Sequence, residues 1–143
     1  MKKIAIVTLS DFNNYGNRLQ NYALERIITS QGYDVVSLVD FRPNLLKTSV
    51  KTIIKKDGIK FTDRMKKIRR LKNFLDFDKK YVNTFPVNAG EFSSVSDDEY
   101  HCFIVGSDQV WNPDWAKYTY DRMFLRFCSP TKRISYAASF GVD

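Results

Sequence analysis

The N-terminal residues form four successive segments: an apolar run, a polar loop, a stretch with helical periodicity and a second apolar run. Residues 4–9 form the first near-continuous apolar stretch, and residues 33–39 form the second. Between them, one helical face is apolar and comprises Leu19, Tyr22, Ala23, Ile27 and Ile28. Gly32 follows where a helix commonly ends. Units of this kind join parallel strands, so the pattern predicts an α/β fold whose helix over 17–31 packs this apolar face on a sheet.

Further apolar runs extend the predicted sheet. Residues 101–105 and 133–138 have the length and composition of buried strands, and residues 81–86 form a short extended piece. With 143 residues, of which 43% are hydrophobic, the chain can bury one ordinary core. We therefore expect a single domain over 1–143, built as a parallel sheet flanked by helices.

The sequence shows no clear pattern of a membrane span, a secretion signal or a metal site. No window approaches the roughly 20 continuous apolar residues of a spanning helix. The opening segment 1–7 has the charge of a signal peptide, but its apolar run is short and no cleavage pattern follows. Cys102 and Cys128 lie among apolar residues without a CxxC or zinc spacing. We expect a cytoplasmic protein with two reduced, partly buried thiols and no metal site.

The net charge of +7 is concentrated in one segment, because residues 47–80 hold 13 lysines and arginines against four aspartates. Apolar residues recur there at helical spacing: Ile59, Phe61, Met65, Ile68, Leu71, Phe74, Leu75 and Phe77. The segment is therefore predicted to be helical with a basic exposed face. That face is either an ordinary solvated surface or one that meets an anionic membrane or glycan carrier. Nucleic acid is less favoured, because the aromatic residues lie on the apolar face.

The apolar run that ends at Val105 is followed directly by small, polar and aromatic residues: Gly106, Ser107, Asp108, Gln109, Trp111 and Asn112. They bring hydroxyl, carboxylate and amide groups to the carboxyl end of a strand, where open α/β sheets bind ligands. Trp111 offers a flat face of the kind on which sugars stack. In one interpretation Asp108 orients a sugar hydroxyl or acts as a base, and in the other it caps the turn that follows.

The loop between the first strand and the first helix carries a second polar cluster. It lacks the GxGxxG and P-loop patterns, so neither a dinucleotide site nor a P-loop site is supported. Gly16 permits close approach of the backbone, while Asn13, Asn14, Asn17 and Arg18 supply hydrogen-bonding groups suited to a polyhydroxylated ligand. Alternatively, Asn13 and Asn14 are turn residues, Asn17 caps the helix and Arg18 is a surface charge.

Three segments, residues 14–24, 105–112 and 135–141, resemble the polysaccharide pyruvyl transferase family in order and in spacing. The basic segment 47–80 matches only as a variable helical insert. By this resemblance and the loop chemistry above, the substrate-binding candidates are Asn14, Tyr15, Gly16, Asn17, Arg18, Gly106, Ser107, Asp108, Gln109, Trp111, Asn112 and Ser139. Asp108 is also the one candidate for a catalytic role.

The resemblance implies two Rossmann-like halves, similar to those of GT-B glycosyltransferases, with a cleft between them. Family members transfer pyruvate from phosphoenolpyruvate to a sugar as a cyclic ketal, in the synthesis of bacterial cell-surface polysaccharides. Such an enzyme needs no cofactor, and its acceptor is a sugar or a lipid-linked glycan. The resemblance assigns the anion-binding arginines and the catalytic histidine largely to a C-terminal half. His101 is the only histidine in this chain and begins an apolar strand, which favours a structural role.

The resemblance thus implies that residues 1–143 form the N-terminal, acceptor-side half and lack the C-terminal domain. We expect this half to catalyse nothing by itself, and to lie in the cytoplasm, with peripheral contact at the inner face of the membrane through 47–80. Two alternatives stay open. One is half of a nucleotide-sugar glycosyltransferase of GT-B type, and the other is a non-enzymatic module that uses the basic segment to bind glycan or membrane.

Overall fold

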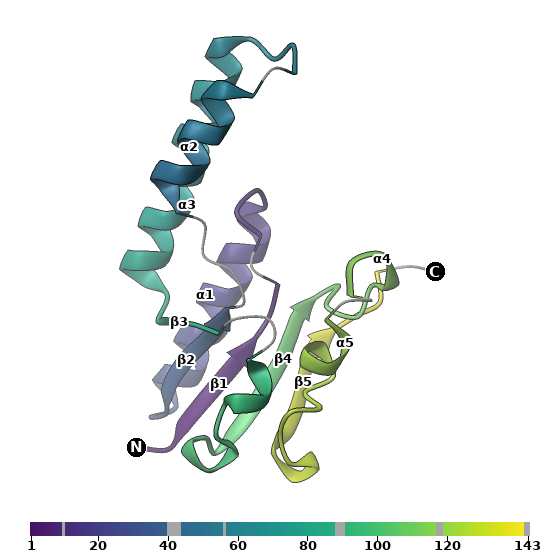
Figure 1. Cartoon of the computed structure of the whole chain (residues 1–143). Coiled ribbons are helices and arrows are strands. Elements are labelled where there is room, and N and C mark those ends of the chain that lie inside the picture. Colours follow the sequence, from purple (N-terminus) through teal and green to yellow (C-terminus); the bar gives the residue numbers. More distant parts are fainter. Residues whose placement is uncertain (10, 40–43, 56, 88–90, 117–118, 142–143) are drawn as a thin grey trace.

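The computed structural model of the protein describes residues 1–9, 11–39, 44–55, 57–87, 91–116 and 119–141. Five strands form one sheet in the order β3-β2-β1-β4-β5, and every neighbouring pair is parallel (Figure 1). The strands are β1 (Lys3–Val7), β2 (Asp34–Val39), β3 (Thr84–Pro86), β4 (Cys102–Asp108) and β5 (Arg133–Ala138). This confirms the predicted α/β, Rossmann-like fold, including the short strand within 81–86.

Helices connect these strands. The longer ones are α1 (Tyr15–Ser30), α2 (Leu45–Ile54) and α3 (Phe61–Tyr81), and the shorter ones are α4 (Pro113–Ala116) and α5 (Tyr120–Met123). The helix α1 ends as predicted, because Gly32 adopts a positive φ of 85° and its N–H donates to the carbonyl oxygen of Thr29 at 2.9 Å. None of the helices in the described ranges is both long enough and apolar enough to cross a membrane.

The two faces of the sheet are buried against different layers, as alternation along a strand requires. Ile4 and Ile6 of β1 belong to a cluster that includes Leu24 and Ile28 of α1. Ala5 and Val7 belong to the opposite cluster, which is completed by residues between 87 and 128. Both cysteines are buried free thiols, which confirms the prediction of reduced thiols. The central strands are therefore covered on both sides. The prediction that 133–138 is a buried strand is wrong, because β5 lies at the edge of the sheet and its side chains are exposed, apart from Ala138, which is partly buried.

The predicted apolar face of α1 is wrong. Leu19 and Ile27 are 55% and 57% exposed, Ala23 is exposed, Tyr22 is partly buried, and only Ile28 of the predicted set is buried. The helix instead buries a mixed face: Asn17, Arg18, Asn21, Leu24, Glu25 and Ile28. Most of the polar groups on this face are paired, although the side-chain nitrogen of Asn21 is buried without a hydrogen-bond partner among the described residues. Glu25, for example, accepts from the Asn83 backbone N–H at 2.9 Å, while burial raises the pKa of its carboxyl.

The basic segment is helical, as predicted, and forms the crossover between the parallel strands β2 and β3. Its helices α2 and α3 lie side by side as a hairpin that extends past the carboxyl ends of the strands (Figure 1). The C-terminal half of α3 packs against the rest of the domain, because Phe74 and Asp78 are only 1% and 3% exposed. Lys56 of this segment lies outside the described residues.

Candidate functional site

The two predicted loops meet beside the central strand of the sheet. From β1 the chain crosses to β2 on one side, whereas β4 pairs with β1 on the other side. Such a reversal opens the crevice in which open α/β sheets place ligands. Here the Asn17 side-chain amide donates to Oδ2 of Asp108 at 3.0 Å, across 91 residues of sequence. The structure therefore joins the polar loop after β1 to the polar end of β4.

Asn17 is the centre of a buried hydrogen-bond network and is only 3% exposed. Its Oδ1 accepts from the Asp11 backbone N–H at 3.4 Å and from Nε and a terminal nitrogen of Arg18 at 3.2 and 2.7 Å. With its amide on Asp108, the side chain fixes the loop against the strand end. Asn17 thus orients Asp108 and the loop backbone from beneath the surface.

Arg18 is neither a surface charge nor an accessible anion ligand in this structure, because it is 1% exposed. A terminal nitrogen donates to the carbonyl oxygen of Leu9 at 2.6 Å, and the other pairs with Asp78 of α3 at 3.3 Å. These partners account for the buried charge. The guanidinium therefore ties the end of the first strand, the start of α1 and α3 together.

Asn14, and not Asn17, caps α1. The Asn14 Oδ1 accepts from the Asn17 backbone N–H at 3.2 Å, which is the usual bond of an N-cap residue. The alternative in which Asn17 holds the cap is wrong, because the helix begins two residues earlier than predicted. Asn13, Asn14, Tyr15 and Gly16 are all exposed around this cap. They form the accessible part of the loop.

Three residues of α3 support the loop: Arg70 and Asp78, which the sequence did not single out, and Phe74, which its periodicity placed only on an apolar helix face. Arg70 donates to the carbonyl oxygen of Asn13, Phe74 stacks on Tyr15 with 4.4 Å between ring centroids, and Asp78 pairs with Arg18. They are spaced four residues apart, so they lie on one face of α3. That spacing is the signal in the sequence that could have revealed them.

At the end of β4, the backbone of Gly106 lies against β5. Its φ is 115°, and a Cβ at this position would lie 2.1 Å from the carbonyl oxygen of Tyr136, so only glycine fits. Next along the strand, Ser107, Asp108 and Gln109 are partly buried. Asp108 Oδ1 accepts from the Gln109 backbone N–H at 2.8 Å, so both carboxylate oxygens have a protein partner.

The residues after β4 are held by the end of β5. Ser139 donates its backbone N–H to the Asp108 carbonyl oxygen at 3.0 Å, and the Trp111 N–H donates to the Ser139 carbonyl oxygen at 3.1 Å. Asn112 is 3% exposed, and its amide reaches the Gln109 side-chain oxygen at 3.3 Å. Ser139 is exposed beside them. All three segments of the predicted site are therefore contiguous.

The Trp111 ring is largely occupied by the protein. It stacks on Phe124 with 5.3 Å between ring centroids and a 4° interplanar angle, and its Nε1 donates to the Met123 carbonyl oxygen at 2.9 Å. Phe140 lies tilted against it at 5.5 Å. Trp111 thus packs with aromatic neighbours and supports the turn next to Asp108.

This arrangement is suited to binding hydroxyl groups. A carboxylate has about four acceptor sites, so Asp108 keeps capacity beyond its two protein donors. His101 is exposed at the other end of β4, stacked on Tyr33, and cannot join Asp108 in a proton relay. Among the residues that the structure describes, no group of three His, Cys, Asp or Glu is placed to hold a metal ion.

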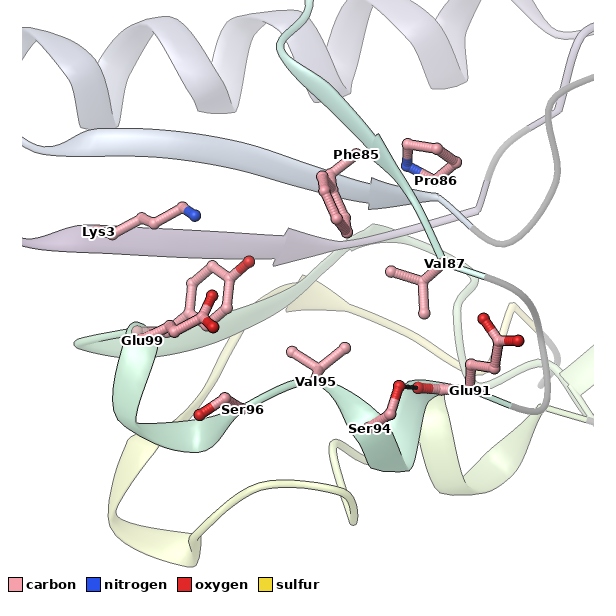
Figure 2. A pocket seen from close by; sticks show the side chains of 10 residues that line it. Lys3, Phe85, Pro86, Val87, Glu91, Ser94, Val95, Ser96 and Glu99 are labelled. Atoms are coloured by element: carbon pink, nitrogen blue, oxygen red, sulfur yellow. Dashed lines mark hydrogen bonds between the residues drawn. The ribbon is translucent and has the colours of Figure 1, made fainter.

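Two hollows lie among the described residues. One of about 360 Å³ lies between β3 and residues 91–100, where Lys3, Glu91 and Glu99 contribute charges (Figure 2). No residue of the predicted site lines it. A smaller hollow of about 140 Å³ lies between α1 and α3 and includes Tyr15 and Arg18 in its lining. Neither of these two hollows has Asp108 in its lining.

Comparison with known proteins gives one match. A family described as polysaccharide pyruvyl transferase matches residues 14–143, which includes both loops and β5. No curated protein and no solved structure matches the chain. The match covers most of the sequence and all of the site residues from Asn14 onward. The chain therefore belongs to the polysaccharide pyruvyl transferase family.

Proposed function

We propose that this chain forms the acceptor side of an enzyme that transfers pyruvate from phosphoenolpyruvate to a sugar of a cell-surface polysaccharide, as a cyclic ketal. Family membership supports the class of reaction. The observation that carries the assignment of the site is the hydrogen bond between Asn17 and Asp108, which joins two segments of the family match at the edge of the sheet where ligands bind.

The reaction requires binding groups for two substrates, phosphoenolpyruvate as donor and a sugar as acceptor. The methylene carbon of phosphoenolpyruvate gains a proton, the oxygens of two sugar hydroxyls bond to the adjacent carbon, and the bond from that carbon to the phosphate oxygen breaks. Of the two protons that the hydroxyls lose, one balances the proton on the methylene carbon and the other leaves with the phosphate. Asp108 accepts hydrogen bonds from the two reacting sugar hydroxyls and holds these hydroxyls in position for attack. The exposed amides of Asn13 and Asn14 bind other hydroxyls of the same sugar. Asp108 is thus the proposed catalytic residue of this half.

The donor carries a carboxylate and a phosphate, which require accessible cations. Arg18, the cation of the polar loop after β1, is already bonded to Leu9, Asn17 and Asp78 and is excluded from solvent. We therefore assign donor binding to a second half that faces this one across a GT-B-like cleft. By this reasoning, residues 1–143 bind an acceptor and do not turn over the donor.

Titration of the ¹⁵N-labelled 143-residue chain with methyl glucoside, methyl galactoside and methyl mannoside tests this assignment. We expect amide shift changes in 11–16 and 107–112, and their loss in Asp108→Asn, which is close in shape but lacks the charge. Ile27→Gln, at an exposed site on α1, is the matched control and should bind like the parent. Phosphoenolpyruvate should neither shift these amides nor release phosphate.

Two outcomes would contradict the proposal. Release of phosphate from phosphoenolpyruvate by this chain in the presence of a sugar would show that the second half is not needed. Shifts in 11–16 and 107–112 with a nucleotide sugar, and none with the methyl glycosides, would favour the glycosyltransferase alternative.

A further inference from the structure

The helix α2 carries four of its five large apolar side chains on the face that solvent reaches, and the fifth, Leu45, is partly buried. Leu46, Val50, Ile53 and Ile54 are 78%, 54%, 47% and 69% exposed. Their spacing of four, three and one residues places them on one side of the helix. A surface helix of a globular protein normally turns such a stripe toward the core. In α2 the stripe faces outward, and no residue of the helix is buried.

A different face of α2 is turned toward α3. Thr48, Ser49 and Thr52 are partly buried, and Arg64 of α3 donates to the carbonyl oxygen of Thr52. Arg64 is 7% exposed and also pairs with Asp57 in the connection between the helices. Rotation of α2 to bury its apolar stripe would break these bonds. The outward orientation is therefore built into the hairpin.

Lysines border the apolar stripe. Lys47, Lys51 and the C-cap residue Lys55 are exposed, and each follows one of the apolar residues by one position, which is about 100° around the helix. The Lys55 ammonium also lies 3.7 Å from a carboxylate oxygen of Asp57. Their own spacing of four residues aligns them in a row along one side of the stripe. The stripe and this row define the α2 face. Figure 1 shows the hairpin that carries it extending away from the sheet.

We propose that the α2 face docks on an anionic lipid surface. The four apolar side chains enter the boundary between headgroups and acyl chains, and the three lysines contact lipid phosphates. The local charge of 13 basic against four acidic residues complements such a surface. A second copy of the chain would bring two lysine rows together, and an aliphatic stripe offers no ring on which nucleic-acid bases stack. The inference is independent of the reaction proposed above.

Co-sedimentation of the whole chain with vesicles tests this inference. We expect binding to phosphatidylcholine vesicles that contain phosphatidylglycerol, little binding to phosphatidylcholine alone, and weakening by added salt. Val50→Gln/Ile53→Gln should weaken binding at least about tenfold, because it removes apolar burial. Lys47→Gln/Lys51→Gln/Lys55→Gln should weaken it by about fivefold per lysine. The matched control, Leu19→Gln/Ile27→Gln on α1, exchanges a pair of similar exposure and should bind like the parent.

All substituted side chains are exposed, so circular dichroism should show folded variants. Equal binding to neutral and anionic vesicles would overturn the proposal, as would full binding by Val50→Gln/Ile53→Gln. A dimer in sedimentation velocity that this variant abolishes would assign the α2 face to a second copy. Binding to a single-stranded RNA in preference to anionic vesicles would equally refute a lipid-docking role.

Discussion

Replacement of Arg18 by methionine tests the buried ion pair beneath the loop. Methionine fills much of the same volume but removes the donors to Leu9 and Asn17 and the ion pair with Asp78 at 3.3 Å. Breaking a buried ion pair costs about 3–5 kcal/mol. An unsatisfied buried carbonyl adds about 1–3 kcal/mol, part of which the surrounding structure recovers by relaxing. We expect the free energy of unfolding to fall by about 4 kcal/mol.

Urea denaturation followed by circular dichroism measures this loss. Arg69→Met is the control, because Arg69 is exposed on α3, and it should change stability by at most about 0.5 kcal/mol. Arg18→Met/Asp78→Leu, which replaces both charges by apolar groups, should recover much of the loss. A loss below about 1 kcal/mol for Arg18→Met would refute the reasoning, since that is the range of a surface charge.

Three further predictions concern single groups. Burial raises the pKa of the Glu25 carboxyl, so its contribution to stability is complete below the ordinary pKa of 4.5 and is lost as pH rises through the folded-state pKa. Glu25→Gln should therefore gain stability relative to the parent as pH rises. A difference in stability that does not change with pH would contradict this. Gly106→Ala should cost more than about 2 kcal/mol in urea denaturation, because its Cβ meets the Tyr136 backbone; Gly58→Ala, with φ of 72° and nothing within 4 Å, should cost only about 1–2 kcal/mol, and equal losses would exclude the close contact as the cause. Burial also raises the pKa of the Cys102 and Cys128 thiols, so both should react slowly with a disulfide reagent until the chain is unfolded, and rapid reaction of the native protein would show that they are accessible.

Periodicity was sufficient to predict the three central strands, because β1, β2 and β4 are short apolar runs, but it wrongly predicted burial for the edge strand β5. It failed for α1, where polar residues are buried and Leu19 and Ile27 are exposed. The partner of Arg18 is Asp78, which is 60 residues away in the sequence. A local sequence pattern carries no information about such a pairing, so Arg18 was interpreted as a surface charge or a ligand-binding residue.

The meeting of the two loops could be anticipated, because parallel strands end at the same edge of a sheet. What the sequence did not reveal is which side chains remain accessible. Asn17 and Arg18 lie beneath the surface, whereas Asn13 and Asn14 face solvent. The supporting role of α3 was hidden because its residues belong to a segment that reads as a variable, basic insert.

The helix α3 belongs both to the hairpin and to the support of the loop at Asn13 and Tyr15. It runs for 21 residues without glycine or proline, and it contacts α2 through Arg64 and the loop through Arg70 and Phe74. A lipid bound on α2 and a sugar bound at the loop are therefore both next to this one helix. If lipid binding shifts α3 and thereby changes the affinity of the loop for a sugar, the sugar must change the affinity for lipid by the same factor.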